Sequence, residues 1–290
     1  MSAIAKTIKV ALLQFYAASD KTANLLKAQQ LALKAIKKQP DLDLLVLPEC
    51  FNSPYAVDQF HNYCEKIPEG ETTHFLSTFA KEHKVAVIGG SFPELGDDGN
   101  VYNTSLTFDN TGKIVAKHRK VHLFDIDIPG KMTFKESATL HAGNKATVFD
   151  IDGLGRFGLA ICYDIRFPEL AMTASRKGAG TIVYPGAFNT VTGPRFWTKF
   201  GVARAIDNQT FVILCSPARN PNGGYQAYGH SMVVDPNGDV LVEAGHDEEI
   251  VYAELDPEIE KEARRNIPLS TQRRFDIYRD VSKDAVAGAL

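Results

Sequence analysis

The stretch Gly158-Leu-Ala-Ile-Cys162-Tyr-Asp-Ile-Arg-Phe-Pro168-Glu-Leu170 joins a run of small and apolar residues to the start of a helical pattern. The residues before Cys162 are typical of a buried strand. Pro168 suits the first turn of a helix, where its missing N–H costs nothing, and Gly178 is typical of the end of that helix. We therefore predict that Cys162 lies on a turn between a buried strand and a helix.

This position bears on the reactivity of the Cys162 thiol. A cysteine near a helix N-terminus is expected to ionise more readily, and the thiolate is the form that acts as a nucleophile. The alternative is a structural cysteine buried in the core, which is common for free thiols. The choice between the two depends on which other residues lie nearby.

Strand-length apolar runs alternate with helical patterns on both sides of this stretch. The first half predicts strands at 8–15, 42–47 and 85–89, helices at 24–38 and 72–83, and a hairpin over 102–117. The second half predicts strands at 157–162, 181–184 and 211–215, helices after Pro168 and at 195–207, and further strands at 231–235, 240–243 and 250–255. This order favours parallel or mixed sheets covered by helices. Two such sheets packed face to face, in one domain, satisfy the pattern.

The composition narrows the class of protein. The chain has 290 residues, 44% of them hydrophobic, and a net charge of −3 without a block of basic residues, so we expect neither nucleic acid nor an anionic membrane as a partner. No apolar stretch is long enough to span a bilayer, and the segment before the first strand is so short that we expect no signal peptide there. The cysteines at 50, 64, 162 and 215 show no CxxC pair and are expected to be reduced thiols. The expected compartment is the cytoplasm, with the mitochondrion as the alternative.

Glu49 and Lys120 are the charged residues best placed for chemistry. Glu49 ends the run Leu44-Leu-Val-Leu-Pro-Glu49, at the carboxyl end of a predicted buried strand, where α/β proteins place their sites. Burial there would raise its pKa towards that of a general base, although a helix cap or surface position is the alternative. Lys120 ends the basic stretch Lys117-His-Arg-Lys120. Such clusters are usually solvated, but the apolar residues that follow indicate that one of these cations points inwards. A buried cation needs a partner, which Glu49 or a thiolate would supply.

The histidines suggest a competing arrangement. His118, His122 or His230 could pair with a cysteine, and the sequence alone leaves that possibility open. His118 and His122 are four residues apart but lack the HExxH pattern and a third ligand at a suitable spacing, so we expect no metal. Nucleophile-elbow, P-loop and dinucleotide-binding motifs are missing from the sequence, so we expect no cofactor.

Three segments together resemble the signature stretches of the nitrilase, or carbon–nitrogen hydrolase, superfamily. They are Leu47-Pro-Glu49, His118-Arg-Lys120-Val-His-Leu123 and Ile161-Cys162-Tyr-Asp-Ile-Arg-Phe-Pro-Glu169. Three further stretches resemble the omega-amidase branch of that superfamily: 122–136, Pro185-Gly-Ala-Phe188 and Ser216-Pro-Ala-Arg219. The resemblance extends from about residue 8 to residue 256.

The resemblance implies an α/β fold arranged as an α-β-β-α four-layer sandwich over residues 1–256. Residues 257–290 would form a C-terminal helix and tail that contribute to a homodimer, with disorder expected over 282–290. The implied activity is hydrolysis of the terminal amide of small dicarboxylic acid monoamides, such as 2-oxoglutaramate or 2-oxosuccinamate, through a cysteine thioester. The alternatives are a related hydrolase acting on an N-carbamoyl amino acid, a deaminated peptide amide or a nitrile, and a non-catalytic binding or scaffold protein.

The resemblance also implies roles for individual residues. Glu49 would be the general base, Lys120 the cationic stabiliser and Cys162 the nucleophile. Glu136 would hold Lys120 and help orient substrate or water. The backbone N–H of Tyr163 would join Lys120 in stabilising the oxyanion.

A dicarboxylic acid monoamide carries a carboxylate, so the site should contain a cation besides Lys120. Arg166 is the candidate, with an ion pair to Asp164 or Glu169 as its alternative role. Tyr55 could gate the substrate or form a hydrogen bond with it, or simply be a loop aromatic. Phe188 could form a wall of the pocket.

Overall fold

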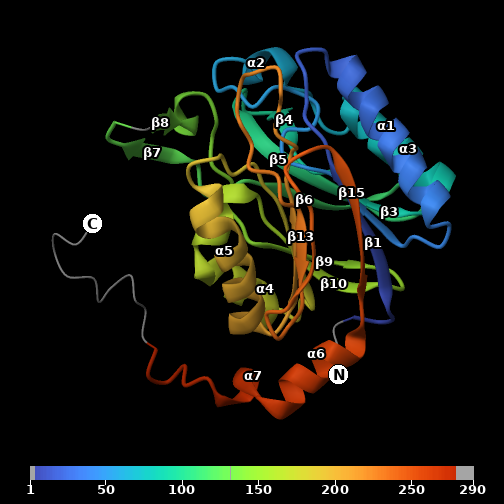
Figure 1. Cartoon of the computed structure of the whole chain (residues 1–290), viewed down its shortest axis with the longest axis vertical. Helices are drawn as coiled ribbons and strands as arrows, with labels where there is room; N and C mark the ends of the chain where they lie inside the picture. Colours follow the sequence, from blue (N-terminus) through green and yellow to red (C-terminus); the bar gives the residue numbers. More distant parts are fainter. Residues whose placement is uncertain (1–3, 131, 279–290) are drawn as a thin grey trace.

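The computed structural model describes residues 4–130 and 132–278 (Figure 1). The disorder predicted for residues 282–290 lies outside the described residues. In the described part of the chain, no helix is both long and apolar enough to cross a membrane.

Seven strands of the described residues form one mixed sheet. In spatial order they are β15 (Glu249–Leu255), β1 (Ile8–Gln14), β2 (Leu44–Val46), β3 (Ala86–Ile88), β5 (Val101–Phe108) and β4 (Phe92–Leu95), with β6 (Ile114–Arg119) paired to β5. Strands β1, β2 and β3 run parallel, so their carboxyl ends share one edge. Strand β15 runs antiparallel to β1 along its whole length and joins the two halves of the chain.

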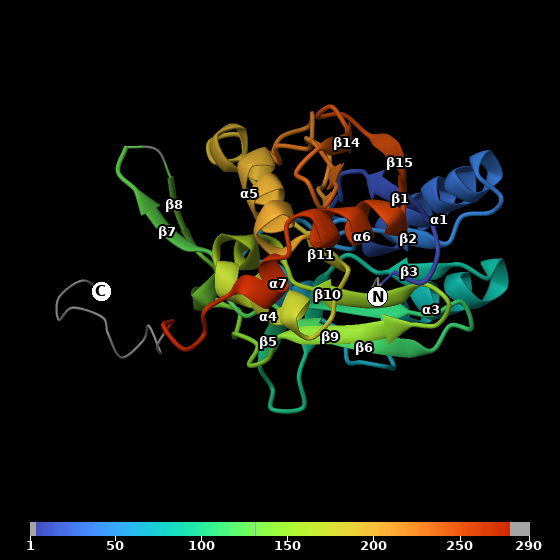
Figure 2. The same ribbon diagram turned by 90° about the horizontal axis from the view of Figure 1, so that it is seen from below.

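Six strands of the described residues form a second sheet. In spatial order they are β14 (Val240–Glu243), β13 (Met232–Val234), β12 (Phe211–Cys215), β11 (Thr181–Pro185), β10 (Gly155–Leu159) and β9 (Thr147–Ile151). Its central strands, β10, β11 and β12, are parallel. A separate hairpin of β7 (Asp125–Ile128) and β8 (Met132–Lys135) extends away from the body (Figure 2).

The helices cover the outer faces of the two sheets. Helices α1 (Lys21–Lys38) and α3 (Glu71–His83) lie on one side, and α4 (Pro168–Arg176) and α5 (Gly193–Asn208) lie on the other (Figure 1). Strand β1 is apolar on both of its faces over residues 10–13. Leu12 faces the core between the sheets, whereas Leu13 faces the core beneath α1 and α3. The predicted α-β-β-α sandwich is confirmed.

Two helix ends show how local sequence sets the boundaries. Helix α1 begins at Lys21, earlier than the predicted residue 24, because the Asp20 side chain accepts a hydrogen bond from the N–H of Ala23 (3.1 Å) and caps the helix. The predicted helix over 257–265 forms as α6 (Pro257–Asn266), which Asp256 caps in the same way. The short helices α2 (Phe60–Tyr63) and α7 (Leu269–Gln272) were not predicted.

The segment that contains α6 and α7 is tied to the body by polar contacts. The Gln209 side-chain amide, just after α5, donates to the carbonyl groups of Ala263 (2.9 Å) and Ile267 (2.7 Å). Arg273 donates to the Asp207 carbonyl. These contacts hold the C-terminal segment against the ends of α4 and α5.

Candidate active site

Four charged or nucleophilic side chains come together just after the ends of four strands. Glu49 follows β2, Lys120 follows β6, Glu136 follows β8 and Cys162 follows β10. All four are almost fully buried, with 0 to 4% of each residue exposed. The ammonium of Lys120 lies 2.8 Å from Glu136 Oε1 and 3.3 Å from Glu49 Oε1. The prediction that a cation of the basic stretch 117–120 points inwards, with Glu49 as a partner, is therefore confirmed for Lys120.

The carboxylate of Glu49 is held by donors on both of its oxygens. The Asn103 side-chain amide donates to Oε1 (2.9 Å), and the N–H of Ala187 donates to Oε2 (2.6 Å). The Cys162 thiol lies beside this carboxylate, close enough for a hydrogen bond. Burial raises the pKa of Glu49 above its ordinary value, although Lys120 acts in the opposite direction. The predicted direction of this shift is confirmed.

Lys120 remains charged although it is buried. Burial lowers its pKa, but the Glu136 and Glu49 carboxylates outweigh that effect and hold the pKa well above its ordinary value. Glu136 is fixed in turn by Tyr55, whose hydroxyl donates to Oε1 (2.6 Å), and by the N–H of Phe124, which donates to Oε2 (2.7 Å). The ammonium is thus a permanent positive charge whose position is set by two carboxylates.

The turn that carries Cys162 lies where it was predicted, between a buried strand and a helix. Cys162 begins a 3-10 turn, Cys162–Arg166, and helix α4 starts at Pro168. Burial and the neighbouring Glu49 carboxylate raise the pKa of the thiol well above its ordinary value, with Lys120 acting against them. The expectation of a thiolate stabilised by a helix N-terminus was therefore wrong. Burial and Glu49 thus favour the protonated thiol, and forming the thiolate calls for a proton acceptor.

The backbone at Cys162 is in the left-handed region, with φ of 47°. A side chain on the facing Gly186 would place its Cβ only 3.1 Å from Cys162 Cα. The turn therefore packs directly against the chain that leaves β11, and it needs further contacts to hold this conformation.

The histidines considered as partners for Cys162 each contact a carboxylate. His118 Nε2 lies 3.1 Å from Asp164 Oδ2, His122 Nδ1 lies 2.7 Å from Asp164 Oδ1, and His230 Nδ1 lies 2.8 Å from Glu243 Oε1. The thiol instead faces Glu49. Within residues 4–130 and 132–278, no group of three or more His, Cys, Asp or Glu side chains could hold a metal ion.

Arg166 lies among aromatic rings instead of forming its alternative ion pair. Its guanidinium is 4.7 to 5.4 Å from the ring centres of four residues, Tyr163, Phe188, Phe196 and Phe200. Asp164 is occupied by the histidines. The Nε atom of Arg166 is buried and has no hydrogen-bond partner among the described residues. The guanidinium also interacts electrostatically with Cys162.

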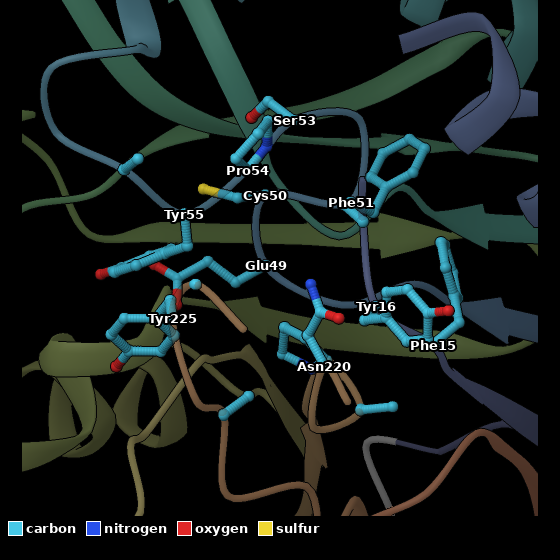
Figure 3. A pocket seen from close by; sticks show the side chains of 16 residues that line it. Phe15, Tyr16, Glu49, Cys50, Phe51, Ser53, Pro54, Tyr55, Asn220 and Tyr225 are labelled. Atoms are coloured by element: carbon cyan, nitrogen blue, oxygen red, sulfur yellow. The ribbon is translucent and has the colours of Figure 1, made fainter. Parts of the chain in front are cut away.

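An aromatic cluster borders the site. The Tyr55 ring lies 5.7 Å from that of Phe134 on β8 and 4.5 Å from that of Tyr225, centre to centre. The Tyr225 hydroxyl donates to the Ala187 carbonyl (2.5 Å). A cavity of about 120 Å³ reaches Glu49, and Figure 3 shows Glu49 extending towards the rings of Tyr55 and Tyr225.

Sequence analysis missed several residues of the site. Asn103 lies on β5, a strand whose residues are all buried, and an amide there signals a buried polar partner. Tyr225 comes from the Gly- and Pro-rich stretch 221–229, where no periodic pattern marks it. The N–H of Ala187 carries no side-chain signal at all.

The buried charges predict the effect of removing the cation. We expect Lys120→Met to lower the free energy of unfolding by about 3–5 kcal/mol, because Glu49 and Glu136 lose the buried charge that compensates them. Lys117→Met is the matched control. Lys117 is partly exposed, and its partner Glu94 also binds Arg119, so we expect a loss of about 1 kcal/mol or less. Urea unfolding measures both, and equal losses would contradict the buried charge balance.

Comparison with known proteins agrees with this geometry. The family model for carbon-nitrogen hydrolases matches residues 9–265. The omega-amidase NIT3 of Saccharomyces cerevisiae is 53% identical over 96% of this chain and 97% of that protein, and the omega-amidase NIT2 of Mus musculus is 48% identical over 96% and 99%. The crystal structure of Saccharomyces cerevisiae Nit3, a member of branch 10 of the nitrilase superfamily, superposes with a TM-score of 0.88, at 49% identity over 95% of this chain and 99% of that one. The resemblance drawn from the sequence is confirmed, and the chain belongs to the carbon-nitrogen hydrolase family of the nitrilase superfamily.

Proposed function

We propose that the protein is an omega-amidase that hydrolyses the terminal amide of short dicarboxylic acid monoamides, such as 2-oxoglutaramate or 2-oxosuccinamate, to the acid and ammonia. One observation carries the proposal: the buried Cys162 thiol lies beside the Glu49 carboxylate, which also contacts the Lys120 ammonium. Relatives named omega-amidases, at 48–53% identity over most of their length, support the choice of substrate.

The first half of the reaction forms a thioester. Glu49 accepts the Cys162 proton as the sulfur attacks the amide carbonyl carbon. The Lys120 ammonium and the backbone N–H of Tyr163 stabilise the negative charge that develops on the carbonyl oxygen. Protonated Glu49 then donates its proton to the leaving nitrogen, and ammonia departs as the C–N bond breaks.

The second half hydrolyses the thioester. Glu49, again ionised, accepts a proton from water as the water oxygen attacks the acyl carbon. The carboxylic acid leaves, and the proton returns to the Cys162 sulfur. Glu136 keeps the Lys120 ammonium in place through both steps, since it holds Nζ at 2.8 Å and is itself anchored by Tyr55.

The protonation states suit this sequence of steps. Burial raises the pKa values of both Glu49 and Cys162, so each group favours its protonated form, and the proposed mechanism passes one proton between them. A carboxyl group with a raised pKa serves as base towards the thiol and as acid towards the leaving amine. General acid–base catalysis of this kind contributes about 10²–10⁴ in rate.

Arg166 is our candidate for binding the substrate carboxylate. Its guanidinium interacts electrostatically with Cys162, is ringed by aromatic side chains, and has a buried Nε without a partner in the described chain. A carboxylate on the substrate would satisfy that donor and the positive charge. Tyr55 would orient the site through Glu136, and Phe188, which is buried beside Arg166, would form the wall of the pocket.

A substrate panel tests the proposed activity. We expect ammonia release from 2-oxoglutaramate to exceed that from an N-carbamoyl amino acid, a simple nitrile and a deaminated peptide amide, and to vanish in Cys162→Ala. Cys215→Ala is the matched control, because that buried thiol contacts backbone carbonyl groups of Leu13 and Val46. Its turnover should be retained. Turnover by Cys162→Ala would contradict the mechanism, and preference for another substrate would point to the related hydrolases. Lack of turnover with all four would favour a binding protein.

The carboxylate-binding role predicts a substrate-dependent effect of Arg166→Met. A hydrogen-bonded charge pair is worth about 1.5–3 kcal/mol, so kcat/KM for 2-oxoglutaramate should fall by roughly 10- to 150-fold. The same variant should act normally on a short amide that has no carboxylate. Arg156→Met, at an exposed ion pair with Asp150, is the control. Equal losses on both substrates would show that Arg166 only supports the fold.

We also propose that the protein is a homodimer. Large apolar side chains are exposed on α5 and in the C-terminal segment: Phe196, Ile206, Phe275, Ile277 and Tyr278. Sedimentation should give a mass near twice 31.9 kDa, and Ile206→Glu should shift the equilibrium towards monomer. Leu26→Glu, at an exposed position on α1, should not. A monomeric wild type, or dissociation by Leu26→Glu, would contradict this interface.

We place the protein in the cytoplasm, with the mitochondrion as the alternative. Its four cysteines are free thiols, which fits a reducing compartment. Fractionation of cells that express the tagged full-length chain would decide between them.

A further inference from the structure

The carboxylate of Asp164 binds main-chain groups on two separate segments of the site. Its Oδ2 accepts from the N–H of Ile161 (2.9 Å), and its Oδ1 accepts from the N–H of His122 (2.9 Å). Ile161 immediately precedes Cys162, and His122 lies two residues after Lys120. A single buried carboxylate therefore links the turn of the thiol to the segment of the ammonium.

Two histidine rings complete the surroundings of Asp164. His118 Nε2 lies 3.1 Å from Oδ2, and His122 Nδ1 lies 2.7 Å from Oδ1. An ionised carboxylate can only accept hydrogen bonds, so His118 Nε2 and His122 Nδ1 each carry a proton in this arrangement. Thr147 Oγ1 lies 2.9 Å from the other nitrogen of the first ring, His118 Nδ1, while His122 stacks on Phe167 with 3.6 Å between ring centres. Each carboxylate oxygen thus faces one main-chain and one ring donor.

Asp164 binds next to Cys162, whose backbone conformation needs support from surrounding contacts. Cys162 has a positive φ, a conformation that non-glycine residues adopt only when surrounding contacts enforce it. The N–H of Asp164 also donates to the Ile161 carbonyl (3.0 Å), so backbone and side chain of Asp164 both hold Ile161. Reaction geometry is sensitive at this scale, because a misplacement of about 1 Å can cost roughly 10²-fold in rate.

We propose that Asp164 is a positioning residue, which sets the Cys162 sulfur relative to Lys120 and Glu49 by binding Ile161 and His122 at the same time. The proposal rests on the roles proposed above for Cys162 and Lys120. Asp164 touches neither substrate nor reacting atoms. It acts through the two main-chain segments that it joins.

The substitution Asp164→Asn separates this role from simple burial of a polar group. An amide has one accepting oxygen, whereas both sides of the carboxylate face a main-chain N–H. In either orientation of the amide, its NH₂ group meets the N–H of Ile161 or of His122, so one segment is released. The histidine rings can adapt by changing tautomer, but the main-chain donors cannot.

We expect Asp164→Asn to lower kcat by about 10²-fold with little change in KM, because substrate binding uses other residues. Alkylation of Cys162 by iodoacetamide, followed by peptide mass spectrometry, should also slow. Glu65→Gln is the matched control, a buried carboxylate that binds Thr72 and Lys21. It should lower the melting temperature while kcat and alkylation stay near the wild-type values.

Two outcomes would overturn the proposal: wild-type kcat and alkylation in folded Asp164→Asn, or equal losses in Glu65→Gln. If Asp164→Asn does not fold, replacing the main-chain N–H of Ile161 by an ester oxygen decides. That change removes one main-chain donor to Asp164 and leaves every side chain in place, so kcat and Cys162 alkylation should fall several-fold. Wild-type values in the folded ester variant would then overturn the proposal. Alkylation needs no amide substrate, so it tests the positioning of Cys162 even if the proposed activity fails.

Discussion

The site depends on the balance of charge around the buried Lys120 ammonium. The carboxylates of Glu136 and Glu49 both contact the ammonium nitrogen of Lys120, at 2.8 and 3.3 Å, and all three groups are excluded from solvent. A buried charge without a partner costs several kcal/mol, so each of these groups requires the others. The Glu49 carboxylate, which belongs to this balance, also interacts with the Cys162 thiol. Structural stability and chemical reactivity therefore rest on the same set of contacts.

The two-sheet architecture brings these groups together from distant parts of the chain. Glu49 and Cys162 follow central parallel strands of opposite sheets, β2 and β10, and the sheets pack face to face through an apolar core. Lys120 leaves β6 at the same end, and Glu136 returns there after the β7–β8 hairpin. Asp164 adds a polar connection between two of these segments. The core supplies the rigid frame, and main-chain hydrogen bonds set the final positions of the reactive atoms.

Much of this could be predicted from the sequence, because apolar runs mark buried strands and polar residues at their ends mark an edge of the sheet. That pattern located Glu49, Lys120 and Cys162, and family resemblance added Glu136. The helical stabilisation of a Cys162 thiolate was a wrong prediction, since periodicity does not show how strongly burial and Glu49 act on the thiol. The contacts of Asp164 could not be predicted from the sequence. A carboxylate near a basic residue suggests an ion pair, here with Arg166. The β7 strand was missed although Asp125-Ile-Asp-Ile128 alternates in the period of a strand.

In this site a carboxylate, Glu49, is placed to accept the thiol proton, a role that histidine fills in many cysteine hydrolases. Rapid-quench mass spectrometry of the wild-type enzyme mixed with 2-oxoglutaramate tests this chemistry most directly. We expect an acyl group on the peptide that contains Cys162, formed as ammonia is released and lost on treatment with hydroxylamine, as a thioester requires. Ammonia release without an adduct on Cys162 before the first turnover is complete, or an adduct on Cys50 instead, would contradict the assignment of Cys162 as the nucleophile.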